Sequence, residues 1–366
     1  MSFPLPFQLP FPHLYAGIET VRPPMPVLFT IVTVGLLVLW ARNSILAKKN
    51  YQHKSSSVSS VFKSKAYHDK ILAIYKQKLS EWPTHTSRYL QTQTYGTIHV
   101  LVSGPETGNP MILIPACGLG AWSWWRNVGA WNEAGYRTYA IDNVGEANRN
   151  RSNVHNHDDD DSGGVASTTV VVPPQTGTEI AEFYEDVIVH HLGIPEEEPV
   201  IVVGASIGGY IATQLAIHKP RRVDKLVLIG PMGFGISTAK IILIMICSML
   251  FPIRWVQDRT LQWAFGNDPV VVEAFSEWFR LVMTGTRPNP IVPHSFSDDD
   301  LKKVTVSTLA FVAQYDSIVG RNVPHVMSRL KHIRNVQIQT VQSGHLPAIE
   351  CPTQVNQQVL NFLRGE

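Results

Sequence analysis

Two kinds of hydrophobic pattern divide the chain. From about residue 90, short apolar runs bounded by Gly and Pro alternate with longer segments of helical periodicity. This alternation predicts a mostly parallel sheet with helices on both faces. The expected strands are Thr97–Ser103, Met111–Pro115, Tyr136–Asp142, Val200–Gly204, Lys225–Ile229, Thr308–Ala313 and Val336–Val341. The expected helices include Glu179–His191, Ile207–His218 and Pro352–Arg364.

Two segments interrupt the alternation. Val154–Gln175 carries the run HNHDDDDSGG and reads as a surface insertion with a solvated acidic loop rather than a metal site. The second segment, from about Met232 to Thr305, is far longer than one crossover helix requires. It contains Ile241–Phe251, which is nearly all apolar but too short to span a bilayer. It therefore predicts a helical cap over a pocket, in preference to a helix lying on a membrane surface.

The N-terminal pattern is different. Residues 1–26 are rich in Pro, Phe and Leu without a period, and the interval between Arg22 and Arg42 has no charge. Trp40 lies at the end of its apolar part, Val27–Ala41, which is where an aromatic residue at the membrane interface is expected. At 1.5 Å per residue the uncharged interval would span about 28 Å, close to the hydrocarbon thickness of a bilayer. We expect a single transmembrane anchor at residues 27–47.

Two other interpretations of this segment fit less well. A cleaved signal peptide would need a shorter leading region without Glu19 and a small-residue cleavage site. A buried core helix is the third interpretation. Four basic residues follow the run, whereas Arg22 alone precedes it, so the positive-inside rule places the body of the protein in the cytosol. These four are Arg42, Lys48, Lys49 and Lys54. The glycosylation sequon at Asn150 would be used only if the body of the protein lay on the opposite side of the membrane.

The composition excludes several classes of protein. Of 366 residues, 44% are hydrophobic, 16% are charged, and the formal net charge is +2. The chain can bury a large core, is too apolar for disorder, and is too neutral for a nucleic-acid binder held by phosphate contacts. Cys117, Cys247 and Cys351 are odd in number and widely spaced. They argue against a disulfide framework and against a cysteine-based zinc site.

The most informative motif is Gly204-Ala-Ser206-Ile-Gly208, which follows an apolar strand and precedes an apolar-periodic helix. A sharp strand-to-helix turn of this kind exposes a serine hydroxyl above the edge of the sheet. Gly204 and Gly208 remove side chains with which such a turn would clash. The helix N-terminus favours developing negative charge. Ser206 is therefore the predicted nucleophile.

A serine nucleophile needs a base and an orienting acid, which should follow it in the order acid, then histidine. Asp316 lies just after the apolar strand Thr308–Ala313, and His345 lies in a Gly-rich loop after the last strand. The rival acids are Asp142, which precedes the serine, and Asp298–Asp300, which reads as a helix start capped by Ser297. The rival histidines lack a matching context; they are His190, His191, His294, His325 and His332.

The oxyanion of the reaction needs backbone N–H donors. One should be the amide of Ile207, directly after the nucleophile. The other should come from the loop after Met111–Pro115, where position assigns it to Cys117. The Cys117 thiol itself is expected to line the pocket rather than to act as a nucleophile.

Together these residues resemble the α/β-hydrolase superfamily over roughly residues 90–366, and most closely its bacterial-type carboxylesterase branch. The stretches AIDNVGEANR, from Ala140, and GHLP, from Gly344, are similar to that branch's strand-loop and histidine-loop signatures. The resemblance implies a Ser206–His345–Asp316 triad, an acyl-enzyme and a helical cap after the sixth strand. One departure is Pro115-Ala116 in place of the usual His-Gly before the oxyanion residue, which restricts the loop.

The sequence thus predicts a membrane-anchored serine hydrolase that cleaves an ester-like bond of a small hydrophobic substrate, without a metal or organic cofactor. Two alternatives remain, a non-catalytic binding protein of the same fold and a same-fold acyltransferase, perhydrolase or lyase. The chain is expected to divide into a tail (1–26), an anchor (27–47) and a tether with a leading helix (48–89). The first part of the core (90–231), the cap (232–305) and the second part of the core (306–366) follow.

Overall fold

The structure is a computed structural model that describes residues 61–151, 172–235, 254–265, 269–287, 290–316, 318 and 323–366. The chain divides into two compact units, Met1–Ser57 and Val58–Glu366, and all described residues belong to the second. The expected tail and anchor, most of the tether, residues 154–171 of the insertion and the apolar run at 241–251 lie outside the described residues. Within the described part, no helix combines the length and apolar character needed to cross a bilayer.

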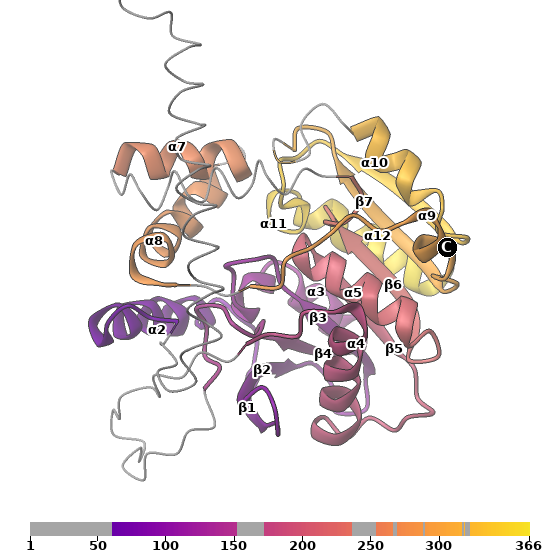
Figure 1. Cartoon of the computed structure of the whole chain (residues 1–366), viewed down its shortest axis with the longest axis horizontal. Helices are drawn as coiled ribbons and strands as arrows, with labels where there is room; N and C mark the ends of the chain where they lie inside the picture. Colours follow the sequence, from indigo (N-terminus) through magenta and orange to yellow (C-terminus); the bar gives the residue numbers. More distant parts are fainter. Residues whose placement is uncertain are drawn as a thin grey trace, which may run out of the picture. The chain divides into compact units, whose positions relative to one another are not determined.

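An eight-stranded sheet forms the centre of this unit (Figure 1). Its spatial order is β1-β2-β4-β3-β5-β6-β7-β8. Strand β2 pairs antiparallel with both β1 and β4, and the pairs from β4 to β8 are parallel. The bounds are β1 His85–Gln91, β2 Thr97–Ser103, β3 Asn109–Ile114, β4 Tyr136–Ile141, β5 Val200–Ala205, β6 Val223–Ile229, β7 Ser307–Ala313 and β8 Val336–Val341.

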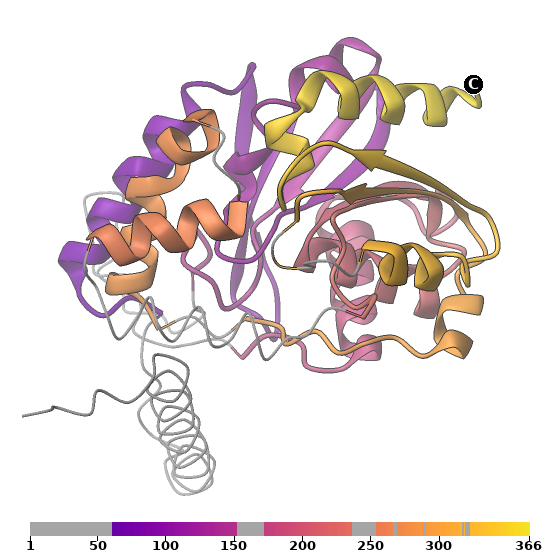
Figure 2. The same cartoon turned by 90° about the horizontal axis from the view of Figure 1, so that it is seen from above.

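Helices connect these strands and cover both faces of the sheet (Figure 2). The described α-helices are α2 Lys65–Leu79, α3 Val128–Glu133, α4 Gly177–Asp186, α5 Ile207–His218, α7 Arg254–Phe265, α8 Pro269–Gly285, α9 Asp298–Lys302, α10 Val323–Leu330, α11 Pro347–Glu350 and α12 Pro352–Arg364. A 3₁₀ turn, η1, spans Ala121–Trp124, and a π turn, η2, spans Val187–His191. Helix α5 is buried along almost its whole length, as its uniformly apolar sequence requires.

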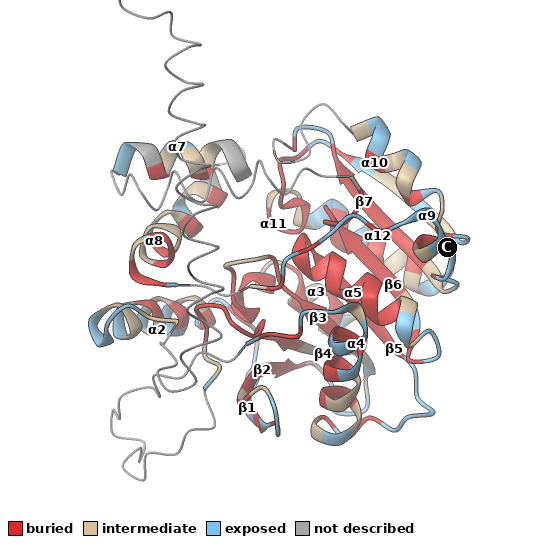
Figure 3. Ribbon diagram, viewed as in Figure 1, coloured by how far each residue is buried: buried red, intermediate tan, exposed pale blue. Residues whose placement is uncertain are grey.

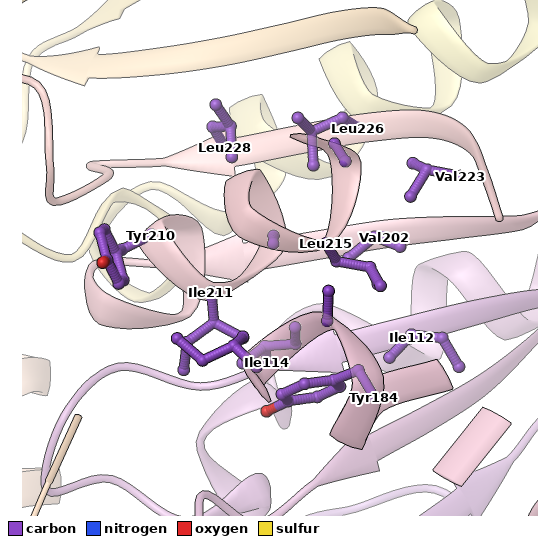
Figure 4. Close-up of a cluster of buried hydrophobic side chains, with 14 of the residues drawn as sticks. Ile112, Ile114, Tyr184, Val202, Tyr210, Ile211, Leu215, Val223, Leu226 and Leu228 are labelled. Carbon is purple, nitrogen blue, oxygen red and sulfur yellow. The ribbon is translucent and has the colours of Figure 1, made fainter. Parts of the chain in front are cut away.

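Alternate residues of each parallel strand enter two separate hydrophobic cores, one on each face of the sheet. Helices α4, α5 and α10 cover the first core, and α2, α3, α8, α11 and α12 contribute to the second. Figure 3 shows the strands buried between these layers. In Figure 4, side chains of α4 and α5 meet those of the strands in the first core; they include Tyr184, Ile211, Leu215, Ile112, Ile114 and Val202.

The mostly parallel sheet and its two helical layers confirm the predicted fold class. The predicted strands all form, with ends that differ by at most two residues. Strand β1 was not predicted because its sequence, HTSRYLQ, is polar and only one of its residues is fully buried. The helix expected at Glu179–His191 begins at Gly177 and changes to the π turn η2 at Val187.

Helices α7 and α8 lie between β6 and β7, inside the segment expected to form a cap. Helix α8 packs against α7 and against α2, and both views show the three helices together (Figures 1 and 2). The chain just before α2 also pairs with the end of α8, where the Lys63 N–H donates to Gly285 O at 2.8 Å. The leading helix and this segment therefore form one layer of packed helices.

Candidate active site

Ser206 occupies the turn between β5 and α5. Its φ is 53° and its ψ is −114°, and among the described residues no other non-glycine residue has a positive φ. Such a backbone conformation costs free energy and persists only where neighbouring contacts fix it. Here the Ser206 N–H donates to Ile229 O at 2.9 Å, and Ser206 O accepts the N–H of Met232 at 3.0 Å. The strained turn is thus bonded on both sides to the chain at the end of β6.

The glycines on either side of Ser206 are required by close approach of the backbone. A Cβ on Gly204 would meet the carbonyl oxygen of Gly208, and a Cβ on Gly208 would meet that of Ile114. Both clashes are with backbone atoms, which cannot move aside as a flexible side chain could. The two glycines therefore allow α5 to begin directly beside the ends of β3 and β5.

The side chains of Ser206, His345 and Asp316 lie together beyond the ends of β5, β7 and β8. The Nε2 atom of His345 is 2.8 Å from Ser206 Oγ, and its Nδ1 atom is 2.7 Å from Asp316 Oδ2. The three residues are 5%, 2% and 2% exposed in that order, for Ser206, His345 and Asp316. Neutral His345 with its proton on Nδ1 can donate to the carboxylate and accept from the hydroxyl. This arrangement can activate a serine hydroxyl.

Hydrogen bonds between carboxylates and backbone N–H groups hold the loop of His345 and the side chain of Asp316 in place. Glu350, at the end of α11, accepts the N–H of Gly344 at 2.6 Å and that of Leu346 at 2.9 Å. Its carboxylate thus binds the N–H groups of the residues on both sides of His345. The second carboxylate oxygen of Asp316, Oδ1, accepts the N–H of Ile318 at 2.8 Å. Sequence reasoning missed Glu350, although its acidic side chain lies within five residues of the predicted histidine.

Two opposing effects determine the pKa of His345. Burial lowers the pKa of the imidazole, whereas the Asp316 carboxylate raises it through charge and a hydrogen bond, and Glu350 raises it further. The net pKa is above the ordinary value of 6.5. The environment therefore favours an imidazole that can accept a proton from a hydroxyl.

The predicted oxyanion donors lie on two elements, and α5 approaches the end of β3 at Gly208, whose Cβ position lies against Ile114 O and Pro115 O. Ile207 is the first residue of α5, and Cys117 belongs to the loop between β3 and η1, residues 115–120, called here the oxyanion loop. Burial and the neighbouring Glu146 carboxyl raise the pKa of the Cys117 thiol well above its ordinary value. The thiolate is therefore disfavoured, which argues against a nucleophilic role for this cysteine.

The rival acids occupy other places. Asp298–Asp300 begin α9, where Ser297 Oγ accepts the N–H of Asp300 at 3.1 Å, as the sequence predicted. Asp142 is fully buried at the end of β4, and its carboxylate accepts the Ala121 N–H at 2.7 Å and lies 2.9 Å from His99 Nδ1. Asp142 therefore belongs to a second polar cluster.

This second cluster has the same residue types as the first. His99 Nε2 is 3.1 Å from Ser87 Oγ, while its Nδ1 faces Asp142. However, Ser87 lies within the edge strand β1 and lacks the strained turn and the helix N-terminus of Ser206. Tyr75 OH donates to Asp142 at 3.1 Å, and the Arg149 guanidinium donates to Ser87 Oγ at 3.3 Å. The cluster connects α2 to the sheet. Its serine can serve as a control for Ser206 in experiments.

An apolar cleft adjoins His345 on the side of η1 and α11. Its lining includes Ala116 and Leu119 of the oxyanion loop, Trp124 of η1, and Leu346 and Ile349 near α11. Ser123 and His345 are the polar side chains that line it. Within the described residues, no group of three or more His, Cys, Asp or Glu is placed to hold a metal ion.

Comparisons with known proteins agree with this architecture. The family model for the alpha/beta hydrolase fold matches residues 109–267. Carboxylesterase YbfK of Bacillus subtilis (strain 168) is 25% identical over 299 residues, which cover 80% of this chain and 92% of that protein. The uncharacterized carboxylesterase nap of the same strain is 25% identical over 307 residues, covering 80% of this chain and 91% of the relative.

Solved structures show the same fold. The crystal structure of carboxylesterase CesB (YbfK) from Bacillus subtilis superposes with a TM-score of 0.67 at 23% identity. The match covers 82% of this chain and 99% of that structure. The similarity therefore extends well beyond the segment matched by the family model.

Proposed function

We propose that this chain, an α/β-hydrolase of the carboxylesterase-like branch, is a serine hydrolase that cleaves ester bonds through an acyl-enzyme. The observation that carries the proposal is the continuous hydrogen-bonded series from Asp316 Oδ2 through His345 to Ser206 Oγ, at 2.7 and 2.8 Å. The strained turn at Ser206 supports it, because this turn places the hydroxyl beside a helix N-terminus.

The proposed reaction proceeds in two halves. His345 Nε2 removes the proton from Ser206 Oγ as that oxygen attacks the carbonyl carbon of the ester. The N–H groups of Cys117 and Ile207 stabilise the negative oxygen that forms, and His345 then protonates the departing alcohol. Water next attacks the acyl-enzyme with His345 again as base, which releases the carboxylic acid and restores Ser206. Asp316 orients the imidazole and stabilises its charged form throughout.

The apolar cleft beside His345 supports a small hydrophobic substrate. Alanine, leucine, isoleucine and tryptophan side chains line most of it, so an apolar group of the ester that approaches His345 from this side would contact apolar surface. A charged group would lose its hydration without gaining a partner. We therefore expect uncharged esters to be better substrates than charged ones.

Labelling with a fluorophosphonate tests the catalytic role of Ser206. The wild-type protein is expected to form a covalent adduct, and Ser206→Ala is expected to form none. Ser87→Ala is the matched control, because Ser87 Oγ also lies 3.1 Å from a histidine nitrogen that faces an aspartate. Ser87→Ala should label like the wild type. An adduct that survives Ser206→Ala but disappears in Ser87→Ala would assign the chemistry to the second cluster.

We also propose that residues 27–47 anchor the protein in a membrane, with the catalytic unit in the cytosol. The uncharged interval between Arg22 and Arg42 supports the anchor, and the basic residues that follow it support the orientation. The sequon residue Asn150 donates from Nδ2 to Asp142 O and Asn143 O, both at 3.1 Å. A glycan on that nitrogen would disrupt these bonds, which agrees with a cytosolic location.

Extraction of membranes with alkaline carbonate tests the anchor. The full-length protein is expected to remain in the membrane pellet, because a spanning helix resists conditions that release peripheral proteins. A variant that lacks residues 1–47 should appear in the supernatant. Release of the full-length protein into the supernatant would contradict a spanning segment.

A further inference from the structure

Two side chains from distant parts of the sequence bind opposite sides of Gly118 in the oxyanion loop. The Gly118 N–H donates to Glu146 Oε2 at 2.9 Å. The carbonyl oxygen of Gly118 accepts the indole N–H of Trp278, from helix α8, at 2.7 Å. Glu146 is 6% exposed and Trp278 is 1% exposed, so water competes little for either bond. Both peptide groups of Gly118 are therefore fixed by side chains outside the loop.

Other residues of the segment after β4 bind the start of the same loop and the first residue of η1, which follows it. Asn143 Nδ2 donates to Pro115 O at 3.2 Å, and Asp142 Oδ1 accepts the Ala121 N–H at 2.7 Å. Asp142, Asn143 and Glu146 all belong to the stretch that resembles the family's strand-loop signature. Three side chains of this stretch thus bind the backbone at the start of the loop, at its middle and at the residue that directly follows it.

We propose that Glu146 and Trp278 are positioning residues that orient the oxyanion loop so that the Cys117 N–H can stabilise the oxyanion. This inference rests on the proposed function. Cys117 shares one peptide group with Gly118, and fixing the plane of that group limits rotation about the Cys117 backbone. Gly118 itself has φ +73°, a left-handed conformation that favours glycine.

The need for external positioning follows from the loop's own sequence. Ala116 stands where related enzymes are expected to have glycine, so the loop cannot adopt every backbone conformation open to a glycine. Within the loop, the Leu119 N–H donates to Ala116 O at 3.1 Å and closes a turn. Glu146 and Trp278 bind Gly118, the residue directly after Cys117. A rotation of the Gly118 peptide groups would directly change the direction of the Cys117 N–H.

The position of Trp278 also connects the loop to two helices. Its ring packs edge-on against Tyr75 of α2 and Trp122 of η1, with centroid distances of 6.1 and 5.3 Å. Helix α8, which lies in the segment expected to form the cap, therefore contributes directly to the geometry of the oxyanion loop. A displacement of α8 would alter transition-state stabilisation and not only access to the cleft.

Four substitutions separate positioning from packing. Glu146→Leu removes the hydrogen-bond acceptor at similar volume, whereas Glu146→Gln keeps a carbonyl oxygen in the same place. Trp278→Phe removes the indole N–H. Trp131→Phe is its matched control, because Trp131 is fully buried and its Nε1 has no hydrogen-bond partner within the described structure. Each variant is made in the full chain, and kcat and KM for an uncharged ester are measured below its melting temperature.

Glu146→Leu and Trp278→Phe are expected to lower kcat by about tenfold or more with KM within about twofold, because loss of one oxyanion donor costs about 10²–10³ in kcat. Glu146→Gln and Trp131→Phe should keep kcat within about threefold. The Glu146→Leu/Trp278→Phe double variant should lose less than the product of the single losses, because both side chains hold the same residue.

Two results would overturn the inference. One is a folded Glu146→Leu protein with the wild-type kcat. The other is an equal loss of kcat in Glu146→Leu and Glu146→Gln, because Glu146→Gln keeps the acceptor. A wild-type protein that forms no fluorophosphonate adduct is a different outcome: it refutes the proposed function itself, and the positioning role with it.

Discussion

Replacement of His345 with alanine is expected to lower kcat for an ester substrate by about 10⁶-fold, the loss typical of removing the base of a serine triad. His345 Nε2 is the partner of Ser206 Oγ at 2.8 Å, so its removal takes away the base that is placed to accept the proton of the hydroxyl. Asp316→Asn should cost about 10⁴-fold, because an amide at that place favours the wrong imidazole tautomer. The double variant should lose little more than His345→Ala alone.

The pH dependence of kcat/KM gives a second measure of the same pair. Because the pKa of His345 is raised, the rate should fall on the acid side of a midpoint above pH 6.5. In Asp316→Asn this midpoint should move to lower pH, since a carboxylate that raises the pKa has been removed. His332→Ala, at a partly exposed histidine near α9, is the control and should change neither kcat nor the midpoint. More than about 1% of wild-type kcat in folded His345→Ala would contradict the proposed base.

The second large effect concerns stability. Burial raises the pKa of Glu146 to about 8, although hydrogen bonds from Gly118, Asn143 and Cys117 oppose the shift. The ordinary pKa is 4.5, so the folded protein binds this proton more tightly than the unfolded chain between about pH 4.5 and pH 8. The free energy of unfolding should therefore fall as pH rises through this window, by up to about 5 kcal/mol, and level off above it.

Urea unfolding of the wild type and of Glu146→Gln at several pH values measures this effect. Glutamine cannot ionise, so its stability should lack this decline, and the difference between the two proteins should favour the variant increasingly up to pH 8. Cys117 and Tyr184 also face Glu146, but burial raises the pKa of the thiol and of the phenol further above this window, so both groups stay protonated in the two folded proteins. A difference that does not change with pH would contradict a buried, proton-binding Glu146.

Much of the fold could be predicted because its determinants are local. The buried parallel strands are continuous apolar runs, and the turn at Ser206 is specified by the glycines beside it. Strand β1 escaped prediction because an edge strand with one face exposed carries polar residues and no clear hydrophobic alternation. The change from α-helix to π turn at Val187–His191 likewise could not be predicted, because the sequence pattern there does not differ from that of a continuing helix.

The supporting residues of the site could not be found in the same way. The bond between Trp278 and Gly118 joins positions 160 residues apart, and the bond between Glu146 and Gly118 joins positions 28 apart. No spacing rule in one sequence identifies such pairs. The available signal was Glu146 itself, an acidic residue between apolar neighbours in the stretch after β4, but its partner is a backbone N–H that only the folded chain defines.

Peptide mass spectrometry of the fluorophosphonate-treated wild-type protein tests the central claim most directly, because it needs no substitution that could disturb folding. The proposed function predicts one modified peptide, the one that contains Ser206, with the phosphonyl group on its hydroxyl. A phosphonyl group on Ser87 or Cys117 instead, or an unmodified protein, would contradict it.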